Sequence, residues 1–249
     1  MSWLGKMMGG AIGFALGGPL GAVTGAAMGH FFIDSRETLP FTNTEKNEAA
    51  YFIAFFSMLA KVAKADGIVK QDEIRAVEQC IAALNLNKQT GDFAKSIFAE
   101  AKNSSSTIDE FARQYYGFAK GKPQLLRSML EMLLHVSFSD THFHPEEERM
   151  ILTVKNIFHV SDYAYELIKK SFIQTPAVDP LEKQYAVLNC TAGSTNDEIK
   201  QSYRKLVRDF HPDTLASKGL PHEFTQFATN KLQEINAAYE AVKNARGIS

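Results

Sequence analysis

The fold of this chain is decided by the stretch Asp197-Glu198-Ile199-Lys200-Gln201-Ser202-Tyr203-Arg204-Lys205-Leu206-Val207-Arg208-Asp209-Phe210-His211-Pro212-Asp213. Its apolar side chains recur at three- and four-residue spacings, the pattern of one buried helix face. Upstream, Ser194-x-x-Asp197 and Thr195-x-x-Glu198 both fit the capping box that starts a helix. Pro212 ends the helix, because the residue before a proline is pushed out of the helical region. The stretch therefore predicts an amphipathic helix that stops at His-Pro-Asp.

A second face of the predicted helix is basic. Lys200, Arg204 and Arg208 recur every four residues, with Lys205 beside them. An exposed cationic face suits docking on an acidic protein surface, because the charges steer the encounter and fix the orientation. The tripeptide that follows offers hydrogen bonds from its His and Asp side chains, while its proline stiffens the chain. The alternative is that the basic stripe is only a solvated face and the tripeptide an ordinary helix stop.

Two further helices flank this stretch in the sequence. After the tripeptide, apolar residues repeat at helical spacing over 224–242, and Pro221 suits the first turn of that helix. Before it, a short helix over 182–188 carries Tyr185 and Leu188. Two helices joined by a loop can pack antiparallel and bury both apolar faces. The C-terminal part thus predicts a helical hairpin closed by a short third helix.

These pieces together resemble a J domain, the module of DnaJ-type co-chaperones, over residues 182–246. The matching segments are Tyr185-x-x-Leu188, Ile199-Lys200-x-x-Tyr203-Arg204-Lys205-Leu206, Phe210-His211-Pro212-Asp213 and Lys231-x-x-Glu234-Ile235-Asn236-x-Ala238-Tyr239. The resemblance implies that the module docks on a DnaK-class chaperone and stimulates its ATP hydrolysis. The partner-binding residues would be His211, Pro212, Asp213, Lys200, Tyr203, Arg204, Lys205 and Arg208. The catalytic residues would belong to the partner, so we expect no enzymatic activity and no cofactor in this chain.

Three features depart from the usual J-domain pattern. Asp209 stands where many J domains carry a basic residue, which would weaken the docking charge. The segment 215–221 makes the loop after the tripeptide longer than usual. After Val242 only seven residues follow, so we expect the usual fourth helix to be absent or vestigial.

The N-terminal region carries a glycine every four residues: Gly5, Gly9, Gly13, Gly17, Gly21, Gly25 and Gly29. The 23 residues from Met7 to Gly29 include no charged side chain, and that length can span a hydrocarbon core as a helix. Glycine and the internal Pro19 are tolerated better in membrane helices than in soluble ones. We therefore expect a transmembrane helix over 1–33 and a juxtamembrane segment over 34–43. The alternative is a helix that lies on the membrane surface.

Glycine at this spacing lets two helix backbones approach closely. Each four-residue step rotates the glycine position by about 40° around the helix axis. Only three or four glycines can therefore lie in one contact, or seam, between two helices. The pattern predicts a homodimer through the membrane helix, with the seam drawn from Gly9, Gly13, Gly17, Gly21 and Gly25. The alternative is that glycine only reduces the bulk of this helix.

The middle of the chain, residues 44–174, is helical throughout by its periodicity, and no stretch alternates with period two. A strongly apolar helix over 51–62 is followed by helices near 71–85, 90–102, 107–119, 123–139, 145–158 and 162–174. A region of this length can build its own core. The whole chain is therefore expected to be all-α.

A faint internal repeat marks this middle region. Asp66 precedes Glu73 by seven positions, and Asp140 precedes Glu147 by the same interval. This duplicated helix–acidic turn–helix resembles the TerB-like (tellurite-resistance) fold. Acidic turns at this spacing make the four residues weak candidates for divalent-cation ligands. We favour the competing interpretation, in which the aspartates cap turns and the glutamates complement helix N-termini.

Residues 175–181 contain two prolines and predict a short, stiff linker, which leaves 182–249 as the J domain. The order of membrane segment, TerB-like domain and J domain resembles the DjlA-type family of membrane-anchored bacterial co-chaperones. The resemblance implies a single-pass protein of the bacterial inner membrane with most of the chain in the cytoplasm, because the ATP-using partner is cytosolic. The formal net charge of −1 gives no sign of nucleic-acid binding.

Two functions remain in competition. The first is a membrane-tethered co-chaperone that binds and stimulates a DnaK-class chaperone, while the middle domain binds an unknown client or partner. The second is a metal- or stress-responsive membrane scaffold that uses the TerB-like acidic turns, with the J domain secondary. The two cysteines, Cys80 and Cys190, fit a reducing compartment.

Overall fold

The computed structural model describes residues 16–29, 42–65, 70–138, 144–172 and 179–248, with the side chains of 70–76 left undescribed. Within these ranges every regular element is a helix, which confirms the all-α prediction. The helices are α3 (Gly18–Gly29), α4 (Asn43–Ala63), α5 (Lys70–Ala83), α6 (Lys88–Asn103), α7 (Ile108–Ala119), α8 (Pro123–Ser137), α9 (Pro145–Ile157), α10 (Asp162–Phe172), α11 (Pro180–Val187), α12 (Asn196–Phe210), α13 (Pro212–Lys218), the 3₁₀ turn η1 (His222–Phe224) and α14 (Thr225–Arg246).

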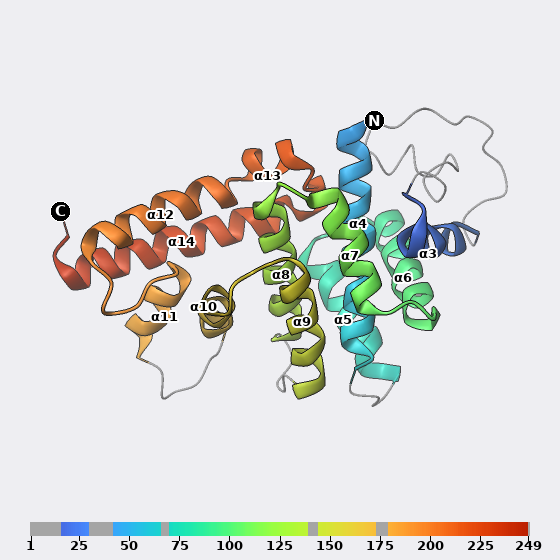
Figure 1. Cartoon of the computed structure of the whole chain (residues 1–249), viewed down its shortest axis with the longest axis horizontal. Coiled ribbons are helices and arrows are strands. Elements are labelled where there is room, and N and C mark those ends of the chain that lie inside the picture. The colour runs from blue at the N-terminus through green and yellow to red at the C-terminus, as the bar shows by residue number, and fades with distance from the viewer. Residues whose placement is uncertain (1–15, 30–41, 66–69, 139–143, 173–178, 249) are drawn as a thin grey trace.

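Helix α4 is the centre of the middle domain. From Ala49 to Ala60 every residue is buried, as expected for a helix that is apolar all round. Helices α5 to α9 pack around it (Figure 1). The helix begins at a capping box, in which the Thr42 hydroxyl accepts from the Glu45 backbone and the Glu45 carboxylate accepts from the Thr42 backbone. Local capping and a continuous apolar surface therefore place α4 at the core.

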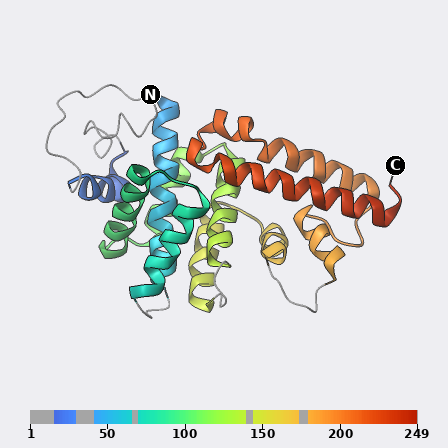
Figure 2. The same cartoon turned by 180° about the vertical axis from the view of Figure 1, so that it is seen from behind.

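The helices of the predicted C-terminal hairpin are all present (Figure 2). Helices α12 and α14 pack side by side, and α11 packs against α14. Arg246, in the last turn of α14, donates to the backbone carbonyls of Ala192 and Ser194 and lies over the Tyr185 ring. These contacts close the end of the hairpin at which the described chain finishes. Helix α14 is the last helix among the described residues.

Two local features differ from the sequence-based expectation. His-Pro-Asp is not an open loop, because Pro212 and Asp213 form the first turn of α13. Proline is favoured at the first position of a helix, where its missing N–H costs nothing. Pro221 precedes η1 and does not open the long helix, which begins at Thr225. The long loop after the tripeptide thus folds into two short helical turns of its own.

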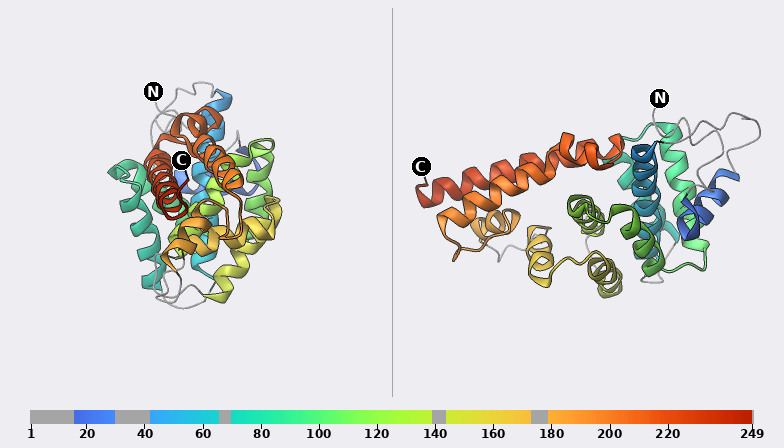
Figure 3. Two further views of the ribbon diagram at one scale, coloured as in Figure 1. Left: turned by 90° about the vertical axis from the view of Figure 1, so that its left-hand side faces the viewer. Right: turned by 45° about the horizontal axis from the view of Figure 1, so that its top comes forward.

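The hairpin rests against the middle domain at its tripeptide end, while the C-terminus lies at its far end (Figure 3). Helix α13 contacts both α4 and α8, and α12 contacts α8. The sequence predicts only a linker between these two units, and most of that linker lies outside the described residues. The structure adds a direct contact between residues far apart in the chain.

The glycine ladder is described only in part. Gly17 and Gly18 have φ angles of 59° and 54°, in the left-handed region, and α3 begins at this break. Gln114 of α7 holds the break, because its amide donates to the Gly17 carbonyl and accepts from the Leu20 backbone N–H. Helix α3 packs against α4, α6 and α7.

The described part of the ladder is short for a membrane helix. The 12 residues of α3 rise by about 18 Å, whereas a hydrocarbon core is about 30 Å thick. In the ranges that the structure describes, no helix is long and apolar enough to cross a bilayer. Most of the predicted span over 1–33, and all but two residues of the juxtamembrane segment, lie outside the described residues.

Candidate partner-docking site

The His-Pro-Asp tripeptide lies exposed at the junction of two helices. His211 ends α12 and caps α13, and its Nδ1 accepts the backbone N–H of Asp213 at 3.2 Å. Because Nδ1 acts as the acceptor, the neutral ring carries its proton on Nε2, which is available to donate to a partner. The side chains of His211 and Asp213 are 47% and 93% exposed. The tripeptide therefore presents polar atoms to solvent from a rigid turn.

Most of the basic side chains on α12 are exposed. Arg204, Lys205 and Arg208 are exposed, and Lys200 is half-buried. Tyr203 has a different role, because its ring stacks on Tyr239 of α14 with centroids 3.9 Å apart. The Tyr203 hydroxyl also donates to Asn236 at 3.1 Å. Tyr203 thus contributes to the contact between the two hairpin helices as well as lying beside the basic face.

Asp209, which follows the basic face of α12, takes part in the contact with the middle domain. Its Oδ1 accepts from Nε2 of Gln124, in α8 of the middle domain, at 3.2 Å. The carboxylate is therefore engaged at the domain contact. The next residue, Phe210, lies under the guanidinium of Arg127, 5.4 Å from the ring centroid. The last turn of α12 is held by the middle domain just before the tripeptide.

The segment after the tripeptide anchors the hairpin in an aromatic socket of the middle domain. The ring of Phe224 is fully buried and meets Tyr51, Phe52 and Phe55 of α4 edge-on, at centroid distances of 4.9, 6.1 and 5.3 Å. Nearby, Gly219 has a φ of 107°, and a Cβ placed there would lie 2.6 Å from Cβ of Asn47. Gly219 in the longer loop and Phe224 just after it therefore both pack against α4 of the middle domain.

A buried charge cluster completes the contact. Glu131 of α8 pairs with Arg127 at 2.7 Å and with Lys231 of α14 at 3.3 Å, and Lys231 pairs with Glu234 at 2.9 Å. Burial by itself would raise the pKa of Glu131, but the charges of Lys231 and Arg127 outweigh it and hold the pKa below its ordinary value. Burial would lower the pKa of Lys231, but Glu131 and Glu234 raise it. Both groups are therefore charged at neutral pH.

Sequence reasoning missed these contact residues. Glu131 interrupts the apolar run Met129–Leu134, and a charge on such a face is a signal of a buried pair. The local sequence pattern does not identify Lys231 as the partner of Glu131, because Lys231 lies 100 positions further along the chain. Phe224 was placed on the apolar face of the second hairpin helix, but its contacts with the middle domain were not predicted.

The weak metal candidates are only partly described. Asp66, Asp140 and the side chain of Glu73 lie outside the described residues. Glu147 forms a capping box at the start of α9, where its carboxylate accepts from the His144 backbone at 3.0 Å. Among the side chains that the structure describes, no group of three acidic, His or Cys residues is arranged to hold a metal ion. Glu147 therefore lies in the first turn of α9, at a helix N-terminus.

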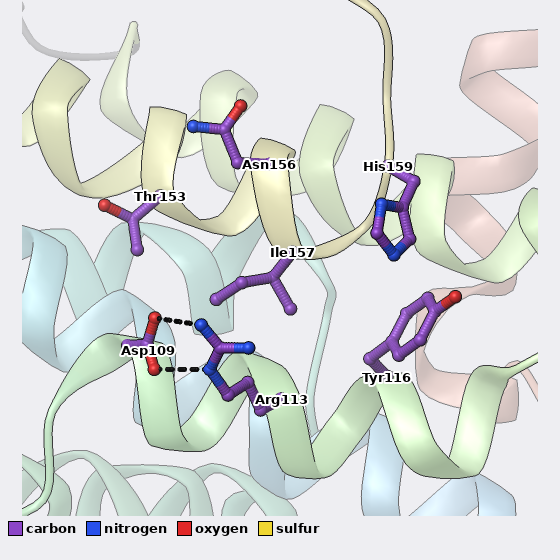
Figure 4. A pocket seen from close by; sticks show the side chains of 7 residues that line it. All are labelled: Asp109, Arg113, Tyr116, Thr153, Asn156, Ile157 and His159. Carbon is purple, nitrogen blue, oxygen red and sulfur yellow. Dashed lines mark hydrogen bonds and ion pairs between the residues drawn. The ribbon is translucent and has the colours of Figure 1, made fainter.

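A separate open groove of about 510 Å³ lies between α7 and α9 (Figure 4). Its lining residues are Asp109, Arg113, Tyr116, Thr153, Asn156, Ile157 and His159. Asp109 and Arg113 pair with each other through two hydrogen bonds, and the rings of Tyr116 and His159 meet edge-on. The charged groups of this groove thus satisfy each other, and the groove contains none of the predicted site residues.

Comparison with known proteins places each part of the chain. Residues 1–39 match the transmembrane domain of co-chaperone DjlA, residues 52–170 match tellurite resistance protein TerB, and residues 183–247 match the DnaJ domain. The co-chaperone protein DjlA of Coxiella burnetii is 32% identical over 269 residues, which cover 100% of both chains. This chain belongs to the DjlA family of co-chaperones. The TerB-like and J-domain resemblances are thereby confirmed.

Other DjlA proteins match at similar levels. The protein of Photobacterium profundum is 29% identical and covers 98% of this chain and 99% of its own length. The protein of Escherichia coli K12 is 28% identical over 88% of this chain and 89% of its own length. No solved structure matches the chain. The match of residues 1–39 supports a membrane-anchored DjlA protein.

Proposed function

We propose that this DjlA family member is a membrane-tethered co-chaperone whose J domain binds a DnaK-class chaperone and stimulates its ATP hydrolysis. The observation that carries the proposal is the exposed tripeptide at the end of an exposed basic helix. The basic face would steer and orient docking on an acidic surface. The tripeptide would then make directional contacts, and the chemistry of hydrolysis would remain in the partner.

The test is single-turnover ATP hydrolysis by a purified DnaK-class chaperone, with and without the full-length chain in detergent. His211→Gln should abolish the stimulation, because it alters the exposed ring at the docking turn. His144→Gln is a matched control: His144 also caps a helix before a proline and accepts a backbone N–H two residues on, at 3.3 Å. Equal stimulation by the wild type and His211→Gln, or no stimulation by the wild type, would contradict the proposal.

We further propose that residues 1–33 anchor the chain in the bacterial inner membrane with the rest in the cytoplasm. The match of residues 1–39 to the DjlA transmembrane domain supports this. The chain should remain with membranes after alkaline carbonate washing, and a variant lacking 1–33 should be released. In spheroplasts, external protease should leave residues 42–249 intact. Degradation of that region would reverse the proposed orientation.

The homodimer through the glycine ladder stays a proposal as well. Among the candidates, Gly9 and Gly13 lie outside the described residues, Gly17 and Gly25 are exposed, and Gly21 is buried. Replacing Gly13, Gly17 and Gly21 by leucine should reduce self-association in a membrane reporter assay, because close backbone approach needs small side chains. Unchanged self-association would remove the dimer proposal.

A further inference from the structure

Arg127 of α8 reaches out of the middle domain and contacts two helix ends of the J domain. Its Nη2 donates to Oδ1 of Asn189, which follows α11, at 3.0 Å. Its guanidinium lies over the ring of Phe210, the last residue of α12. Its Nε donates to Glu131, which in turn pairs with Lys231 of α14. One side chain is thus linked, directly or through one carboxylate, to α12, α14 and the residues that follow α11.

We propose that Arg127 is a positioning residue for the His-Pro-Asp tripeptide, so that the middle domain sets how the J domain presents its docking turn. The inference rests on the proposed co-chaperone function. Phe210 directly precedes His211, so a contact that fixes its ring also fixes the first residue of the tripeptide. The bond from Gln124 to Asp209 supports the same turn from the same helix.

The chemistry of arginine suits this task. A guanidinium is planar and presents its donors in a fixed fork, so bonds on both sides of the fork leave it one orientation. In Arg127 one branch is held by Glu131 and another by Asn189, and the side chain is only 21% exposed. The centre of the group then lies 5.4 Å from the centroid of the Phe210 ring, within the range of a cation–π contact.

Asn189, the J-domain partner of Arg127, is also held in place. Asn189 has a φ of 54°, the left-handed conformation that asparagine tolerates better than most residues. The adjacent Leu188 carbonyl accepts from the Ser202 hydroxyl in the middle of α12 at 2.6 Å. Asn189 is therefore fixed to α12, and Arg127 closes a loop of contacts between α8, the end of α11 and the end of α12. Removing Arg127 opens this loop but leaves Glu131 paired with Lys231.

The experiment titrates the full-length chain against a DnaK-class chaperone and fits two quantities, the maximal stimulation of ATP hydrolysis and the concentration that gives half of it. Arg127→Met should lower the maximal stimulation by roughly threefold or more, because a charge-assisted bond that orients the turn is lost. The half-saturating concentration should change by less than about twofold, because the basic face of α12 that governs encounter is untouched.

The maximal stimulation and the half-saturating concentration together distinguish a positioning role from a loss of folded protein. Partial unfolding would raise the half-saturating concentration and leave the maximum unchanged, since excess chain replaces the inactive fraction. Asn189→Gly is a second variant that permits the same backbone conformation, and it should lower the maximum in the same direction by a smaller factor. Arg113→Met is the matched control, because Arg113 also pairs with a carboxylate four positions away but lies exposed on α7.

The outcomes also separate this inference from the function on which it rests. Stimulation by the wild type that Arg127→Met and Asn189→Gly both retain in full would overturn the positioning role and leave the co-chaperone function standing. A raised half-saturating concentration with an unchanged maximum would overturn it too. No stimulation by the wild-type chain would overturn both proposals.

Discussion

Nζ of Lys231 in α14 lies 3.3 Å from Oε2 of Glu131 in α8, and their side chains are 6% and 0% exposed. The two residues belong to different domains, so this ion pair is buried at the domain contact. Water cannot replace either partner there, and a charge left alone would be strongly disfavoured. The pair therefore forms only when the two domains pack against each other.

Removing one partner of this pair should be costly. Lys231→Met is expected to lower the free energy of unfolding by about 3 kcal/mol, because Glu131 stays buried with less compensation. The double variant Glu131→Leu/Lys231→Met should be less destabilised than the sum of the two single variants, because the buried carboxylate and the buried ammonium group are removed together. Denaturant unfolding of the four chains measures the coupling directly.

The ion pair of Lys95 and Glu78 provides the matched control for the Glu131 and Lys231 variants. They pair at 3.0 Å, but their side chains are 46% and 52% exposed. Lys95→Met should change the free energy of unfolding by no more than about 0.5 kcal/mol, because solvent screens an exposed pair. A similar loss in both lysine variants would show that burial does not govern the Lys231 effect.

The pH dependence of stability should follow the same pair. The pKa of Glu131 is lowered in the folded chain, so its contribution is present above the ordinary value of 4.5 and is lost as the pH falls through the folded pKa. The pKa of Lys231 is raised, so its contribution is present below 10.5 and is lost as the pH rises through its folded pKa. The melting temperature of the wild type should fall more steeply in acid than that of Glu131→Gln. If the melting temperatures of the two chains fell equally as the pH is lowered, Glu131 would not be the source of the acid dependence.

Phe224 should carry much of the apolar contact between the domains. Phe224→Ala is expected to lower the free energy of unfolding by about 3–5 kcal/mol, because it empties a buried aromatic socket. Tyr163 is 61% exposed, and Tyr163→Ala should cost less than about 0.5 kcal/mol. Thermal or denaturant unfolding distinguishes the two, and equal losses would argue against a filled socket around Phe224.

A comparison of Gly219 with Gly247 tests how closely the backbone of Gly219 lies to Asn47. Both end a helix with positive φ, of 107° and 61°. A Cβ at Gly219 would meet Asn47, whereas a Cβ at Gly247 would meet nothing within 4 Å. Gly247→Ala should cost about 1 kcal/mol for backbone strain alone, and Gly219→Ala should cost more. Equal losses in unfolding experiments would show that Asn47 moves aside freely.

Local sequence patterns predicted most of the helices because their causes are local. The capping box at Thr195 and Glu198 forms as expected, with both reciprocal bonds present. The stop before Pro212 follows from the geometry of proline itself. The apolar face of α12 appears as buried Ile199, Leu206 and Phe210. Each of these features depends on residues within a few positions of one another, so periodicity and capping suffice to place them.

By itself, then, the sequence determined the all-α class, the capped start of α12 and its stop before Pro212, and the basic stripe that precedes His211. Only the tertiary structure decided that Arg127, Glu131 and Phe224 join the two domains. Arg127 and Asn189 lie 62 positions apart, and the Phe224 socket is drawn from a helix near the other end of the chain. Such contacts depend on how whole helices pack, and no spacing along one helix encodes a partner on another.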